Sequence, residues 1–200
     1  FAVLFPAYKE DKVIIPAIYS FLQQDYPREL YDIIVISDQM QESTNEALRQ
    51  LPVRLLIADY TDSSKAKAMS LAMNATADIP YDAVVIMDAD NTAGTSFLSE
   101  LNPVFQSGAR AVQAHRTAKN TNTDIAVLDA ASEEINNSIF RSGHIALGLS
   151  SALIGSGMAL EACWFRQHIH LLETAGEDKE MEALLLKQRI HIEYLEHVYV

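Results

Sequence analysis

Short runs of apolar and β-branched residues alternate with helix-like segments through the first half of the chain. The strand-like runs are Ala2–Phe5, Asp32–Ile36, Val53–Ile57 and Ala83–Met87, and the helix-like segments between them are Asp11–Gln24, Glu42–Gln50 and Ser64–Thr76. Strands joined through helices pair in parallel with right-handed crossovers. The alternation therefore predicts an α/β domain with a mostly parallel central sheet flanked by helices.

The rhythm changes in the second half of the chain. A strand-like run at Arg110–Ala114 precedes a helical stretch at Asp124–Arg141, helices near Glu161–Glu173 and Glu177–Arg189, and a final strand-like run at Ile190–Val200. No low-complexity linker or internal repeat divides the 200 residues, so we expect one domain. The uncharged segment Ile145–Leu160 is shorter than the roughly twenty residues of a membrane-spanning helix. Its serines and glycines favour a strand or loop that lines a site.

The fourth strand-like run stops at Asp88-Ala89-Asp90. Two carboxylates at the end of a buried strand repel each other and lose hydration unless a partner compensates, and Mg²⁺ or Mn²⁺ is a natural partner for such oxygen ligands. A calcium loop of the EF-hand type is excluded, because Ala93 and Ser99 stand where that loop needs glycine and glutamate. Two alternatives remain open on these residues alone. Asp90 or Asn91 could simply cap a helix that begins near Thr95, or the string could be the DxDxT of a haloacid-dehalogenase-like phosphatase with Asp88 as nucleophile.

Composition restricts the classes of function. Hydrophobic residues make up 49% of the chain, which is enough for a substantial core, and the formal net charge of −12 argues against a nucleic-acid-binding surface. An anionic substrate must then be held by local groups such as a metal ion, helix N-termini and a few lysines. The single Cys163 excludes an intramolecular disulfide and fits a reducing compartment.

Polar residues follow each of the first four predicted strands. They lie in Pro6–Glu10, Ser37-Asp38, Asp59 with Ser63–Ala66, and Asp88–Asp90. Ligands of open α/β sheets bind beyond the carboxyl ends of the strands. We therefore expect these four loops to line one site.

In this order, the motifs resemble the family-2 glycosyltransferases of the GT-A fold, and the resemblance covers the whole chain. Two strings complete it, Gly155-Ser156-Gly157-Met158 and the pair Glu177-Asp178 at the start of a helix. The resemblance implies a nucleotide-binding half at about 1–92 and an acceptor-binding half at about 93–200. It assigns nucleotide binding to Pro6, Ala7, Tyr8, Glu10, Asp38, Lys65, Asp88 and Asp90, and substrate binding to Gly155, Ser156, Gly157, Glu177 and Asp178.

The same resemblance implies an inverting enzyme, similar to cellulose synthases and N-acetylglucosaminyltransferases. It would transfer a sugar from a nucleotide-sugar, expected to carry UDP, to a saccharide or lipid-linked acceptor. Asp90 would hold Mg²⁺ or Mn²⁺, with Asp88 as a second ligand or a neighbour of the ribose or sugar. A base must take the proton of the acceptor hydroxyl, and Asp178 near a helix N-terminus is the candidate. On sequence alone, Glu177 and Asp178 could instead only cap that helix.

Several departures from the family pattern are visible. Ser64 and Ser70 stand where the family often has glycine and asparagine, and the loop after Asp38 is longer than usual. Neither a Q-x-x-R-W-like motif nor transmembrane helices follow Val200. We therefore expect a cytoplasmic catalytic domain from a parent that works at the inner face of the membrane through parts missing from this chain.

Overall fold

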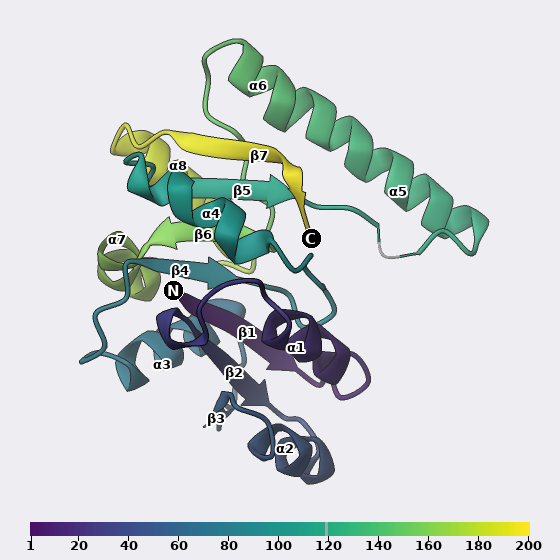
Figure 1. Cartoon of the computed structure of the whole chain (residues 1–200), viewed down its shortest axis with the longest axis vertical. Helices are drawn as coiled ribbons and strands as arrows, with labels where there is room; N and C mark the ends of the chain where they lie inside the picture. The colour runs from purple at the N-terminus through teal and green to yellow at the C-terminus, as the bar shows by residue number, and fades with distance from the viewer. Residues whose placement is uncertain (119) are drawn as a thin grey trace.

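The computed structural model, which describes residues 1–118 and 120–200, builds these residues around a seven-stranded sheet with helices on both faces (Figure 1). The strands lie in the order β3 (Arg54–Ala58), β2 (Asp32–Asp38), β1 (Ala2–Tyr8), β4 (Ala83–Ile86), β6 (Met158–Glu161), β5 (Ala111–His115) and β7 (Ile192–Tyr199). Strand β6 is antiparallel to its neighbours β4 and β5, and the other pairings are parallel. The predicted α/β fold with a mostly parallel sheet is confirmed.

Alternate residues of the inner strands point to opposite faces of the sheet, and each face has its own hydrophobic core. Ala2 and Leu4 of β1 face a core shared with α3 (Lys65–Ala75), α7 (Ala162–His168) and α8 (Glu177–Lys187). Val3 and Phe5 face a core shared with α1 (Ile14–Leu22), α2 (Glu42–Arg49) and α4 (Phe97–Gln106). Short 3₁₀ turns at Arg28–Leu30 and Ile169–Leu171 complete the connections. Because β1 is buried on both faces, its sequence is a continuous apolar run.

The segment Asp11–Gln24 does not form a helix over its whole predicted length. Residues 11–13 form a turn in which the amides of Val13 and Ile14 both donate to the carbonyl of Glu10, and α1 starts at Ile14. Asp11 instead accepts hydrogen bonds from the amide of Gln41, at 2.8 Å, and from the hydroxyl of Thr44, at 2.7 Å. Its carboxylate therefore satisfies the backbone amide of Gln41, which precedes α2, and holds the hydroxyl of Thr44 in the first turn of that helix.

A long rod of helix lies beyond β7 (Figure 1). It consists of α5 (Asp124–Asn136), a π-helical segment at Asn137–Ser142 and α6 (Gly143–Ala146), and so extends past the predicted end at Arg141. Its buried residues are polar, Asn137 and Arg141, whereas Ile125, Leu128, Ile135 and Ile139 are exposed. The rod ends before the glycine-rich part of the uncharged segment, which forms a loop leading into β6. Within the described residues, no helix combines the length and the apolar character that crossing a bilayer requires.

Candidate active site

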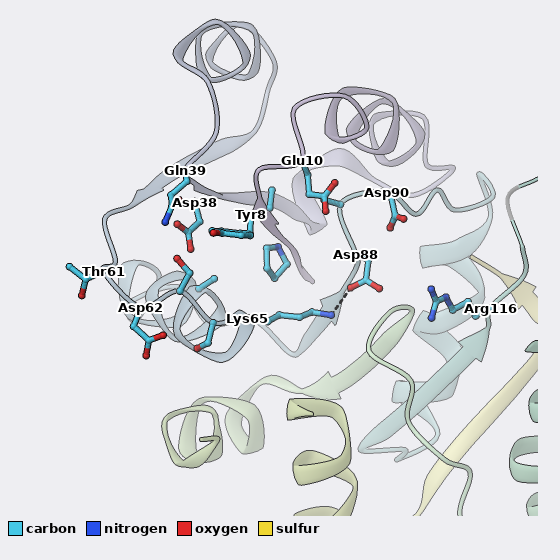
Figure 2. A pocket seen from close by; sticks show the side chains of 16 residues that line it. Tyr8, Glu10, Asp38, Gln39, Thr61, Asp62, Lys65, Asp88, Asp90 and Arg116 are labelled. Carbon is cyan, nitrogen blue, oxygen red and sulfur yellow. Dashed lines mark hydrogen bonds and ion pairs between the residues drawn. The ribbon is translucent and has the colours of Figure 1, made fainter. Parts of the chain in front are cut away.

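A cavity of about 690 Å³ opens beyond the carboxyl ends of the parallel strands (Figure 2). Its lining comes from the carboxyl ends of five strands and the segments that follow them. It comprises Pro6, Ala7, Tyr8, Glu10, Asp38, Gln39, Thr61, Asp62, Ser63, Ser64, Lys65, Ala68, Asp88, Ala89, Asp90 and Arg116. All eight residues that the sequence assigns to nucleotide binding are among them. The structure thus brings together the four strand-end loops, as the parallel topology predicts.

One end of the cavity is formed by the tips of β1 and β2. Their parallel register places Tyr8 opposite Asp38, and Figure 2 shows the Tyr8 ring and the Asp38 carboxylate next to each other. Asp38 is only 3% exposed, and its Oδ1 atom has no hydrogen-bond partner within the described part of the chain. A buried carboxylate oxygen without a donor carries a desolvation cost. A ligand N–H group at this end would remove that cost.

Lys65 stands at the start of α3, just after Ser64 caps the helix by accepting from the amide of Lys67. Its ammonium group lies 2.5 Å from Asp88 Oδ1, donates to the carbonyl of Gly155 at 2.7 Å, and lies 3.4 Å from Glu177 Oε1. These contacts join four segments that are far apart in the sequence. Lys65 is therefore committed to two protein carboxylates, and its expected contact with a phosphate stays a prediction.

The Gly155-Ser156-Gly157 segment is a loop packed against the end of β4. The buried hydroxyl of Ser156 accepts from the amide of Asp88 at 3.0 Å, and the Ser156 carbonyl accepts from the side chain of Gln113 at 2.9 Å. Gly157 has φ of +67°, and a Cβ there would lie 2.6 Å from Val200 Cγ2. Only glycine fits both this backbone conformation and this space. The loop thereby fixes the backbone of the Asp88-Ala89-Asp90 turn.

Helix α8 begins on the other side of this loop. Glu177 is buried and is the residue that reaches Lys65, whereas Asp178 is half-buried. The Oδ1 atom of Asp178 accepts from the amide of Lys179 at 2.8 Å, and a Cβ built on Gly155 would lie 4.0 Å from its Oδ2 atom. Asp178 thus shares the Lys179 amide, which also donates to the Gly176 carbonyl at 3.0 Å, with one oxygen and faces the glycine loop with the other. It is outside the immediate lining of the cavity.

Asp88 and Asp90 are the two carboxylates of the cavity that could hold a metal ion together with a ligand. Both line the cavity, and Figure 2 shows Asp88 between Lys65 and Arg116, with Asp90 above it. In the described ranges, no three or more His, Cys, Asp or Glu side chains form a group suited to a metal. Mg²⁺ sites with one or two protein carboxylates are completed by phosphate oxygens and water. The pair of acids fits a metal ion that arrives together with a phosphorylated ligand.

Arg116 is a lining residue that the sequence reasoning missed. It follows β5, as the other polar residues follow their strands, and this position was the signal that could have found it. Figure 2 shows its guanidinium directed toward Asp88 from the side opposite Lys65. Arg116 thus places a cation at the end of the cavity farthest from Asp38.

Comparisons with known proteins support a single class. The family described as "Glycosyltransferase like family 2" matches residues 1–200. "Probable glycosyltransferase YdaM" of Bacillus subtilis (strain 168) is 26% identical over 96 residues, which are 46% of this chain and 23% of that protein. The chain thus spans about a quarter of the length of the curated relative that it matches.

Solved structures show the same fold. The crystal structure of S. aureus TarS 1-349 in complex with UDP-GlcNAc matches with a TM-score of 0.67 and 14% identity, over 100% of this chain and 58% of that one. Mannosyltransferase PcManGT from Pyrobaculum calidifontis in complex with GDP-Man and Mn²⁺ matches with a TM-score of 0.70 and 18% identity, over 99% and 55%. At these identities, the likeness establishes the GT-A fold.

Proposed function

The chain belongs to the glycosyltransferase-like family 2, and from this premise we propose that it moves a sugar from a nucleotide-sugar donor, with UDP as the nucleotide, to a hydroxyl group of a saccharide or lipid-linked acceptor. The observation that carries the proposal is the cavity itself. It has an unsatisfied carboxylate oxygen of Asp38 at one end and the Asp88-Ala89-Asp90 turn at its centre. A phosphatase that uses Asp88 as nucleophile is not favoured, because the family match and the relatives all point to glycosyl transfer.

The nucleoside is proposed to bind between Tyr8 and Asp38. The Tyr8 ring is exposed, with the Lys9 ammonium over it at 4.8 Å from the centroid, and could stack on the base. Asp38 Oδ1 can accept a hydrogen bond from the N3–H of uracil. Cytosine has an acceptor at the equivalent nitrogen, so the same carboxylate would repel it. The site is therefore expected to prefer UDP over CDP.

The diphosphate is proposed to lie over the Asp88-Ala89-Asp90 turn. When the donor leaves, negative charge develops on the terminal phosphate oxygen and must be stabilised. Asp90, with Asp88 beside it, would hold Mg²⁺ or Mn²⁺, and the ion would supply Lewis-acid stabilisation of that charge. The complex of PcManGT with GDP-Man and Mn²⁺ supports this part of the proposal.

Asp178 is the proposed general base. The first turn of α8 favours negative charge, and the free oxygen of Asp178 faces the glycine loop beside Lys65. The acceptor oxygen would attack the anomeric carbon as its proton passes to Asp178, while the bond to the diphosphate breaks on the opposite side of the ring. Such a displacement inverts the anomeric configuration. Asp178→Asn is expected to keep UDP binding and to abolish transfer in the full-length protein.

Calorimetric titration of UDP and CDP into wild type and Asp38→Asn tests the nucleoside assignment. A hydrogen bond to a charged group contributes about 1.5–3 kcal/mol, so wild type should bind UDP about 10-fold to 100-fold more tightly than CDP. Asp38→Asn should lose most of this preference. Asp62→Asn is the matched control, because Asp62 lines the same cavity with a side chain that is 91% exposed. If wild type binds neither nucleotide, or if both variants keep the preference, the assignment is wrong.

A further inference from the structure

The two cationic side chains of the cavity differ in how many partners they contact within the described residues. The lining has acidic side chains from Glu10 to Asp90, and the cations among the described lining residues are Lys65 and Arg116. Lys65 already contacts Asp88 and Glu177. Arg116 is half-buried, and its guanidinium makes no hydrogen bond or ion pair with another described residue. A guanidinium that loses hydration without a partner offers a site for an anion.

The backbone of Arg116 is held from two sides. On one side, the side-chain amide of Asn137 donates to the Arg116 carbonyl at 2.9 Å and also lies 3.0 Å from His115 Nε2. On the other side, Val200 bridges the neighbouring residues: its amide donates to the His115 carbonyl at 2.9 Å, and its carbonyl accepts from the amide of Thr117 at 2.8 Å. The arginine thus projects into the cavity from a fixed base.

A buried polar network supports Asn137 in turn. Asn137 is 2% exposed, and its carbonyl oxygen accepts a hydrogen bond from Arg141, which is paired with Glu133 at 3.1 Å. The buried hydroxyl of Tyr194, whose pKa burial raises above its usual value, lies 2.8 Å from His115 Nδ1 and can donate to it. The inward polar face of the helical rod therefore acts as the support of the loop that carries Arg116.

The order of the strands fixes where Arg116 meets a ligand. Asp38 is the last residue of β2, Asp88 follows β4, and Arg116 follows β5, which lies beyond β4 and β6 in the same direction along the sheet edge. A nucleotide whose base is at Asp38 and whose phosphates lie over Asp88 and Asp90 directs its terminal phosphate toward Arg116. Figure 2 shows the guanidinium facing this central position.

We infer that Arg116 binds the terminal phosphate of the donor's diphosphate and stabilises it as a leaving group. The inference rests on the proposed function and adds a residue that makes a direct contact with the reacting group. As the acceptor oxygen forms its bond to the anomeric carbon, the electron pair of the breaking bond passes to the terminal phosphate oxygen. The two-pronged guanidinium matches the geometry of phosphate oxygens. Its contribution does not require the metal ion.

The test compares UDP with UMP, titrated calorimetrically in EDTA so that metal does not contribute. Arg116→Gln is expected to weaken UDP binding about 10-fold to 100-fold and to leave UMP binding within about twofold of wild type. Arg116→Lys keeps the positive charge but not the two-pronged guanidinium, and it should recover part of the lost UDP affinity. Arg110→Gln is the matched control, because Arg110 precedes the same strand and pairs with Glu161 on the surface. It should change neither affinity.

The outcomes separate this inference from the proposed function. If wild type binds neither UDP nor UMP, the proposed function fails and the role of Arg116 fails with it. If wild type binds UDP and Arg116→Gln binds it equally well, only the role of Arg116 is refuted. Equal weakening of UDP and UMP would also refute it, since the contact would not be with the terminal phosphate.

Discussion

Replacing Lys65 with methionine should destabilise the protein, because Lys65 joins the start of α3 to three other segments of the site. The ammonium group contacts Asp88, Glu177 and the carbonyl of Gly155. Methionine keeps most of the apolar stem and removes the charge and the donors. The substitution therefore isolates the polar contacts from the packing of the stem.

The magnitude follows from how far these groups are buried. The side chain of Glu177 is 9% exposed, that of Lys65 22% and that of Asp88 31%. Removing one partner of a fully buried pair costs about 3–5 kcal/mol, whereas exposed pairs contribute at most about 1 kcal/mol. An intermediate site should cost about 2–3 kcal/mol. In a domain of this size, that loss lowers the melting temperature by about 5–10 °C.

Urea denaturation and thermal melting of four proteins measure the loss of unfolding free energy and of melting temperature. Besides wild type and Lys65→Met, they include the double variant Lys65→Met with Glu177→Gln, which removes the stranded carboxylate charge and should regain part of the stability. The control is Lys67→Met. Lys67 lies two residues farther along α3, and its partner Asp62 is exposed. A loss in Lys65→Met no larger than in Lys67→Met would refute the idea that Lys65 joins the site together.

Two further predictions concern the glycine loop and the contact between Tyr81, just before β4, and Asp32 at the start of β2. Both Gly157→Ala and Gly155→Ala force alanine into positive φ, which costs about 1–2 kcal/mol each. Only at Gly157 would the new methyl group also meet Val200, at 2.6 Å, so the Gly157→Ala variant should have the lower melting temperature. The reverse order of melting temperatures would contradict the packing described. Burial, and then the hydrogen bond that Tyr81 donates to Asp32, raise the pKa of Tyr81 above its value of about 10 in the unfolded chain. The contribution of Tyr81 to the unfolding free energy is therefore complete below about pH 10 and is lost as the pH rises further. The alkaline decline of the unfolding free energy should be shallower in Tyr81→Phe, and equal slopes would show that Tyr81 is not the group responsible.

Much of the site could be predicted from the sequence because local pattern decides it. Tyr8, Asp38 and Asp88 each come just after an apolar run, so the pattern places them near strand ends, and parallel pairing brings them to one edge. The structure differs from the prediction chiefly in the length of the strands. β1 and β2 run on to Tyr8 and Asp38, because pairing with each other continues past the apolar core.

The rest of the site depends on contacts between distant segments. The sequence shows that Arg116 comes just after a strand-like run, but its place in the cavity depends on the antiparallel β6 that separates β5 from β4, which no local pattern records. Likewise, nothing near Lys65 shows that its ammonium group reaches Glu177, and nothing near Asp11 shows that it caps α2. Such long-range polar contacts are fixed by packing of the whole domain rather than by propensity.

The metal dependence of UDP binding tests the central claim most directly. UDP is titrated into wild type and Asp90→Ala, each with Mn²⁺ and with EDTA, and binding is followed by calorimetry. We predict that Mn²⁺ tightens UDP binding by wild type and that Asp90→Ala abolishes this tightening while it still binds UDP in EDTA, because Asp38 and Tyr8 remain in place. Absence of UDP binding by wild type in Mn²⁺, or an unchanged metal effect in Asp90→Ala, would contradict the account.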